Sequence, residues 1–123
     1  MNRLVFATAA LSALLLQVAP AQAACKDSPK VTSAKKPNQA KLLEACTTAG
    51  VKMHNLCDNV SACTVNDSKE DLKGKVSKAQ KCIDARRQIT KEWYAGNGDA
   101  GHDLAIEGKV NQANKCILQV SKK

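Results

Sequence analysis

Aromatic side chains are almost absent from this 123-residue sequence, which contains one Trp, one Tyr and one Phe. Aromatic rings bury the largest area per residue, so a core that lacks them depends on aliphatic side chains and on covalent cross-links. The sequence also lacks an apolar run of the roughly 20 residues that a membrane-spanning helix needs. These absences favour a small cross-linked domain with no transmembrane helix.

Motifs for metal binding and for thiol redox chemistry are also missing. No C-x-x-C pair occurs, and the only two histidines, His54 and His102, stand at no ligand spacing from a pair of cysteines. The missing pair argues against a thiol oxidoreductase as well. The sequence therefore predicts no metal site and no cofactor.

Residues 1–23 have the pattern of a secretory signal peptide. Arg3 precedes an apolar run from Leu4 to Leu16, and Ala21-Gln22-Ala23 fits the small-residue cleavage pattern. Cleavage after Ala23 leaves residues 24–123, which suffice for one domain. It removes Arg3 alone among the charged residues, so the net charge falls from +8 to +7. We expect an exported bacterial protein, periplasmic or secreted.

All six cysteines follow this signal. An even number of cysteines in an exported chain predicts a framework of three disulfides. The six are Cys25, Cys46, Cys57, Cys63, Cys82 and Cys116.

Three helices are predicted, because apolar residues recur in steps of three and four. The first such stripe runs over Asn38–Cys63, the second over Leu72–Trp93, and the third from Ile106 to Val120. The second helix has two candidate capping pairs in the turn before it, and Asp99 is a plausible cap for the third. The capping pairs are Asp67 with Glu70 and Ser68 with Asp71.

No strand pattern competes with these stripes. The predicted fold is all-α: a small three-helix bundle over residues 38–123, stapled by three disulfides. Residues 24–37 contain two prolines and four lysines and are predicted to form an extended basic arm held by Cys25.

Helix geometry suggests a pairing of the cysteines. If two antiparallel helices turn near residue 65, facing positions have numbers that sum to about 130, as Cys46 and Cys82 do. The same reasoning across the second turn sets Cys116 level with about Gly50 of the first helix. With Cys46 already paired, Cys57 is the nearest cysteine on that helix, although it is not level with Cys116, and this choice leaves Cys25–Cys63. Cys82–Cys116 competes with this set.

The segment from Trp93 to Asp103 concentrates the residues with the most chemical potential. His102 is flanked by Asp99 and Asp103, and a histidine beside a carboxylate can act as a general acid or base. Trp93, Tyr94 and the preceding Arg86 and Arg87 are candidate binding residues. Alternatively, Asp99 only caps a helix, the glycines form a turn, and Trp93 fills the end of the core.

The same region resembles a group of small cysteine-containing domains in bacterial polymorphic toxins. Those domains carry an aromatic residue or Cys, then Gly-Gly-Asp-x-Gly-His, then a helix that ends in Cys. The resemblance covers about residues 82–116, and Asn97 departs from it as an extra residue between two glycines. It implies a role in competition between cells, with His102 and Asp99 as candidate site residues.

Basic side chains crowd the second predicted helix. They form either a phosphate-binding face or an ordinary solvated face, and few aromatic rings are present to stack on nucleic-acid bases. The expected partner is another protein or an anionic substrate, with nucleic acid less well supported. The lysines are Lys69, Lys73, Lys75, Lys78 and Lys81.

Two functional hypotheses follow from the sequence. The first is an exported toxin or effector, a hydrolase that uses His102 and a nearby carboxylate. The second is a non-enzymatic periplasmic inhibitor, immunity-type or adaptor protein that binds another protein.

Overall fold

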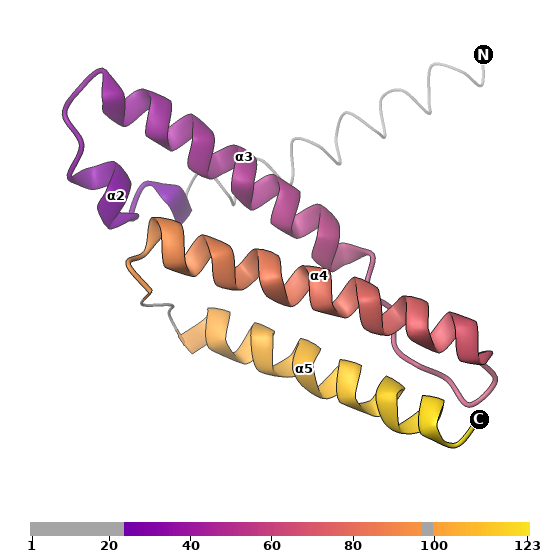
Figure 1. Cartoon of the computed structure of the whole chain (residues 1–123). Coiled ribbons are helices and arrows are strands. Elements are labelled where there is room, and N and C mark those ends of the chain that lie inside the picture. Colours follow the sequence, from indigo (N-terminus) through magenta and orange to yellow (C-terminus); the bar gives the residue numbers. More distant parts are fainter. Residues whose placement is uncertain (1–23, 97–99) are drawn as a thin grey trace, which may run out of the picture. The chain divides into compact units, whose positions relative to one another are not determined.

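The described residues of the computed structural model are 24–96 and 100–123, without the side chains of residues 100–102. The predicted signal peptide and Asp99 lie outside them. These residues form four helices and no strand: α2 (Pro29–Thr32), α3 (Asn38–Asp58), α4 (Lys69–Trp93) and α5 (Ala100–Ser121) (Figure 1). The all-α prediction is confirmed. No helix among these residues is both long enough and apolar enough to span a membrane.

Helix α3 ends five residues before the predicted position at Cys63. The Asn59 side-chain amide donates to the Asn55 carbonyl at 2.9 Å, and the Val60 N–H turns back to the Cys57 carbonyl at 3.3 Å. The last carbonyls of a helix have no partner within it, and these bonds supply partners for two of them at the point where α3 ends. Val60 and Cys63 continue the apolar period in sequence but lie in the connection to α4.

Helix α4 begins with one of the two predicted capping pairs. The Asp71 N–H donates to the Ser68 hydroxyl at 3.1 Å, and the Ser68 N–H donates to the Asp71 carboxylate at 3.3 Å. This reciprocal capping box satisfies two N–H groups that the first turn leaves without partners. The acidic Glu70 and Asp71 also suit the positive end of the helix dipole.

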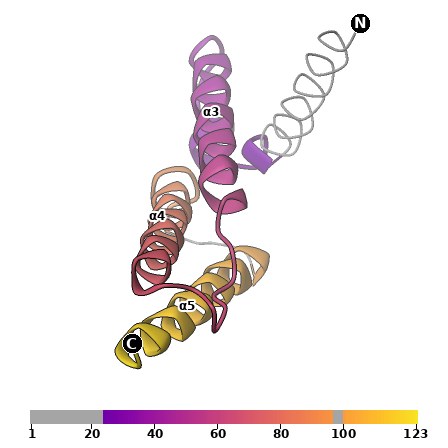
Figure 2. The same cartoon turned by 90° about the vertical axis from the view of Figure 1, so that its right-hand side faces the viewer.

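The chain divides into two compact units, and the boundary at Lys52 and Met53 falls inside α3. In the second unit, α4 and α5 lie side by side and antiparallel (Figures 1 and 2). Among the α5 residues whose side chains are described, Ala113 and Cys116 are buried. The buried residues of α4 are Leu72, Ala79, Cys82, Ile83, Ile89 and Trp93.

The predicted apolar stripe of the third helix is only partly buried. Ala113 is 6% exposed, but Ile117 is 50% exposed, and Ile106, Val110 and Val120 are half-buried. A helical period identifies the apolar face but not how much of that face another element covers.

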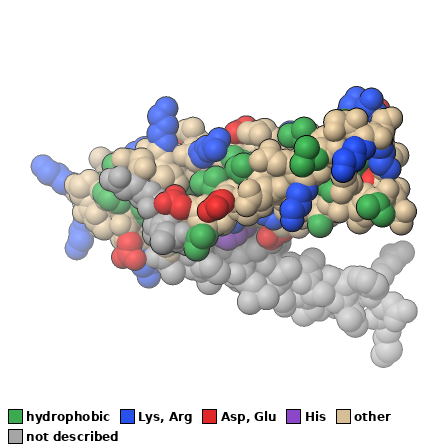
Figure 3. Space-filling model, turned by 90° about the horizontal axis from the view of Figure 1, so that it is seen from below, with side chains coloured by type: hydrophobic (Ala, Val, Ile, Leu, Met, Phe, Trp, Pro, Cys, Tyr) green, Lys and Arg blue, Asp and Glu red, His purple; other side chains and the backbone are tan. Residues whose placement is uncertain are grey.

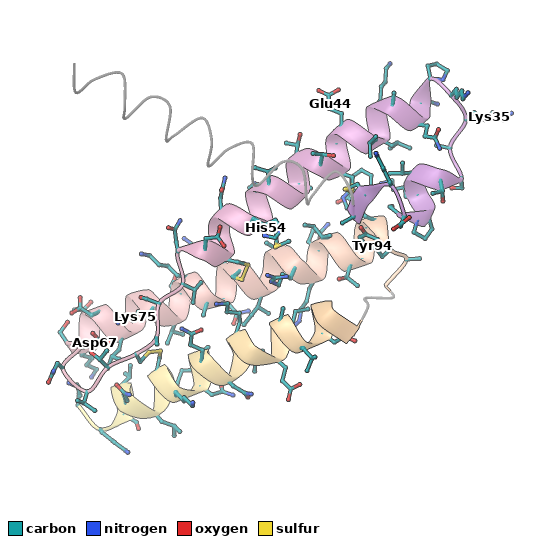
Figure 4. All side chains as sticks on the ribbon, turned by 180° about the vertical axis from the view of Figure 1, so that it is seen from behind. Lys35, Glu44, His54, Asp67, Lys75 and Tyr94 are labelled. Atoms are coloured by element: carbon teal, nitrogen blue, oxygen red, sulfur yellow. A yellow bond between two sulfur atoms is a disulfide. The ribbon has the colours of Figure 1, made fainter. Side chains whose placement is uncertain are left out.

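The connection from residue 59 to 68 is fastened to α4 by one lysine. The Lys75 ammonium contacts the Asp67 carboxylate at 2.7 Å and the Ala62 carbonyl at 2.9 Å (Figure 4). The Thr64 N–H donates to the same Asp67 oxygen at 2.8 Å. The hydrogen bond from Lys75, followed by that from Thr64, lowers the pKa of Asp67 to about 2.

All six cysteines form disulfides, but the predicted pairing is wrong. The pairs are Cys25–Cys46, Cys57–Cys82 and Cys63–Cys116. The prediction assumed a tight turn after the first helix. Instead, Cys57–Cys82 sets the end of α3 level with a point 13 residues into α4, about 20 Å from its start. The ten residues from 59 to 68 can cover that distance because an extended chain spans about 3.3 Å per residue.

The first unit is held by the Cys25–Cys46 disulfide, which joins the N-terminal segment to α3. This segment was predicted to be extended. Part of it is helical instead, because residues 29–32 form the single turn α2 with Pro29 at its start. Val31 is buried, and its carbonyl accepts a hydrogen bond from the Gln39 side chain at 3.3 Å.

Candidate functional site

The turn after α4 brings the two ends of the helix pair together. Both the Tyr94 N–H and the Gly96 N–H donate to the Thr90 carbonyl, at 3.1 and 3.0 Å. Ala95 and Gly96 have φ values of 53° and 81°, in the left-handed region where helices commonly stop. The chain therefore reverses within a few residues, and the first turns of α5 lie beside the last turns of α4.

A groove of about 660 Å³ opens between these turns. The half-buried Ile106 and Val110 of α5 give it apolar walls. Thr90 lines it from α4, and its hydroxyl is directed to the Arg86 carbonyl at 3.1 Å. The described residues that line it are Arg87, Thr90, Lys91, Gly96, Asp103, Ile106, Glu107 and Val110.

Charge of opposite sign lines the two sides of the groove. Arg87 and Lys91 are four residues apart on α4, and Asp103 and Glu107 are four residues apart on α5, so each pair lies on one helix face. All four are exposed, and no ion pair joins them within the described part of the chain. The groove can therefore present two cations and two carboxylates to one ligand.

The predicted site residues are distributed unequally around this groove. Arg87 and Asp103 line it, and His102 belongs to the first turn of α5, next to Asp103. Asp99 lies outside the described residues. Tyr94 is half-buried at the C-cap of α4, and Trp93 is buried at 4% exposure, as a core residue would be.

Arg86 does not line the groove. Its side chain is half-buried, and its Nε has no hydrogen-bond partner among the described residues. Burial lowers the pKa of Arg86, whereas the negative charge of Asp58 acts to raise it. This placement distinguishes Arg86 from its exposed neighbour Arg87, although both were predicted to bind.

Sequence reasoning did not single out Thr90 and Lys91, and it assigned Ile106 and Val110 to the core. The useful signal was the matched spacing of Arg87 with Lys91 and of Asp103 with Glu107, on either side of one tight turn. No cluster of His, Cys, Asp and Glu suited to a metal ion occurs among residues 24–96 and 100–123.

Comparison with curated proteins finds no match, and comparison with solved structures finds none either. A family model, Novel toxin 16, matches residues 50–119. The match covers more than half of the chain, the described residues that line the groove, and the disulfides Cys57–Cys82 and Cys63–Cys116. The predicted resemblance to bacterial polymorphic toxins is confirmed, and the chain belongs to the Novel toxin 16 family.

Proposed function

We propose that this protein is an exported toxin that hydrolyses an anionic substrate held in the α4–α5 groove. The observation that carries the proposal is the juxtaposition of two cations on α4 with two carboxylates on α5, beside the helix turn that contains His102. The family match supports the toxin activity. The reaction and its substrate are our inference.

In this proposal Arg87 and Lys91 hold the anionic group of the substrate. Both are exposed at the groove and remain free to bind, since neither has an ion pair within the described chain. Fixed cations aimed at an oxygen that gains negative charge during hydrolysis stabilise the transition state more than the ground state.

His102 is assigned the proton transfer. A histidine changes charge near neutral pH, so it can accept a proton from attacking water and return it to the leaving group. Asp103 follows it in sequence and lines the groove with Glu107. A carboxylate near the imidazole would orient the ring and stabilise its protonated form.

Export is part of the same proposal. Three disulfides suit an oxidising compartment, as expected of an exported protein. The signal-peptide pattern of residues 1–23 supplies the route.

The test is growth of a bacterial host that directs the protein to its periplasm. We expect the wild type to slow growth and His102→Ala to remove that effect, with stability within about 1 kcal/mol of wild type because the site is at the surface. His54→Ala is the matched control, because His54 lies on α3, outside the groove lining, and should leave toxicity unchanged.

Full toxicity of a folded His102→Ala protein would end the catalytic assignment. Protection of the host against a co-expressed toxic partner, with no harm from the protein itself, would favour the non-enzymatic inhibitor or immunity-type function. Arg87→Ala and Lys91→Ala provide a second test once a substrate is known. Cations that stabilise the transition state more than the ground state should lower kcat when they are removed, whereas a rise in KM alone would limit them to binding the substrate.

A further inference from the structure

We infer that one end of the α4–α5 pair is a docking surface for an anionic lipid bilayer. Three of the four large hydrophobic side chains described as exposed lie near this end: Val65 at 79% exposure, Leu118 at 62% and Ile117 at 50%. The groove described above lies at the opposite end of the helix pair, so this surface is separate from the proposed active site.

Covalent and polar contacts bring these residues together from distant parts of the chain. The Cys63–Cys116 disulfide joins the connection before α4 to α5, two residues from Val65 and one or two from Ile117 and Leu118. The Lys123 ammonium donates to the Val65 carbonyl at 3.1 Å, which holds the two segments together a second time. Val65 therefore sits beside the last turns of α5.

Lysines surround these apolar side chains without acidic neighbours on α5. Residues 108–123 contain four lysines and no Asp or Glu. Lys115, Leu118 and Lys122 are spaced three and four residues apart, so they share one exposed face of the helix. We call Val65, Ile117, Leu118, Lys115, Lys122 and Lys123 the lysine–apolar patch.

Figure 3 views the molecule from the side on which α5 lies. Toward the right of this view, Lys and Arg side chains lie beside hydrophobic side chains. The acid of the connection is already neutralised, because Asp67 is paired with Lys75. The α5 side of the patch is thus positively charged around an apolar centre.

This combination matches the chemistry of a bilayer interface. Exposed aliphatic side chains partition into the region between headgroups and acyl chains, while nearby lysines are attracted to anionic headgroups. Attraction alone would suit any polyanion, but a polyanion gives no reason to expose Val65 and Leu118. The apolar residues therefore favour a lipid surface over a nucleic acid, and the lysines around them favour an anionic bilayer.

The experiment uses the protein recovered after export with its disulfides intact. Binding is measured by co-sedimentation with vesicles of phosphatidylcholine alone or mixed with phosphatidylglycerol, at low salt. We expect binding only to the mixed vesicles.

Val65→Ser with Leu118→Ser should weaken binding to the mixed vesicles about tenfold or more, because burial of apolar side chains is lost. Lys115→Gln with Lys122→Gln should weaken it by about fivefold for each lysine, roughly 25-fold in all.

Two matched controls use residues away from the patch. Leu104→Ser removes an equally exposed leucine about 21 Å along α5, and Lys78→Gln with Lys81→Gln removes two exposed lysines of α4. Both should change vesicle binding less than twofold. All these side chains are exposed, so each variant should keep its circular dichroism spectrum and its melting midpoint.

Failure of the wild type to bind mixed vesicles would overturn the inference. So would equal binding by the Val65→Ser/Leu118→Ser variant and the wild type. Polyglutamate and RNA are included as soluble polyanions: patch-dependent binding to either of them, without binding to vesicles, would assign the surface to an acidic protein or a nucleic acid instead.

Discussion

At the scale of single residues, Thr90 links the end of α4 to the groove. Its carbonyl accepts the N–H groups of Tyr94 and Gly96, which terminates the helix, and its hydroxyl is tied to the Arg86 carbonyl. Thr90 lines the groove together with Arg87 and Lys91 of α4, and Asp103 lines it from α5. The hydrogen bonds that end α4 are therefore made by a residue that also lines the groove.

Trp93 is the large buried ring at this end of the helix pair. It is the only Trp of the chain and is 4% exposed at the last position of α4. We predict that Trp93→Ala lowers the free energy of unfolding by about 3 kcal/mol or more, since truncation of a large buried ring leaves a cavity. Chemical denaturation with the disulfides intact measures it.

Trp93→Phe serves as the control for this substitution, because it keeps most of the buried area and should cost less than the change to Ala. If Trp93→Ala left the denaturation midpoint where it is in the wild type, the ring would contribute to binding and not to the core.

At the scale of the elements, local chemistry determines what the sequence can predict. The start of α4 was predictable because Ser68 and Asp71 make a reciprocal cap, and its end because glycines follow Trp93. The end of α3 was not predictable from the sequence. The helix ends at Asp58, but Val60 and Cys63 continue the helical period of apolar residues beyond it. The apolar stripe of α5 was predictable as a face, but its exposure at Ile117 depends on which helix covers it.

The connection between α3 and α4 should respond to pH through Asp67. Its pKa is about 2 in the folded protein, below the ordinary 3.8, because Lys75 and the Thr64 N–H stabilise the carboxylate. A lowered pKa stabilises the fold above the ordinary value, and this contribution disappears as pH falls through about 4 to 2. We predict that the melting midpoints of wild type and Asp67→Asn differ at pH 6 and converge toward pH 2.

Lys75→Gln tests the cause of that shift. Without the ammonium, the pKa of Asp67 should return toward 3.8, so the pH dependence in this window should shrink as it does in Asp67→Asn. A pH profile of Asp67→Asn that runs parallel to that of wild type from pH 6 to 2 would contradict the assignment.

At the scale of the whole molecule, the disulfides follow the two units. Cys25–Cys46 closes the first unit, and the other two lie in the second, which holds most of the family match. The number of bridges was predictable from the even count of cysteines. Their pairing was not, because it depends on the path of residues 59–68 along α4, and nothing in the composition of that segment sets its direction.

The candidate site was predictable only in part for a related reason. Arg87, Asp103 and His102 were proposed from residue type and neighbourhood, and the structure places the first two in one groove and His102 in the turn that borders it. Lys91 and Thr90 are ordinary helical residues in sequence. They gain a role only when α5 returns beside the end of α4, which is a property of the tertiary structure.

Export and oxidation give the last prediction. If residues 1–23 are a signal peptide, the exported protein should begin at Ala24, and its intact mass should lack that segment and six hydrogens, two for each disulfide. Thiol reagents should label no cysteine under denaturing, non-reducing conditions, because all six are paired. Digestion between the cysteines should then yield peptides joined as Cys25–Cys46, Cys57–Cys82 and Cys63–Cys116.

Cytoplasmic expression provides the comparison, because a reducing compartment should leave the same cysteines open to labelling. Peptides joined as Cys46–Cys82 would instead mean that α3 and α4 meet at a tight turn. The lysine–apolar patch would then need to be reassigned, since the position of Val65 depends on the observed path of residues 59–68.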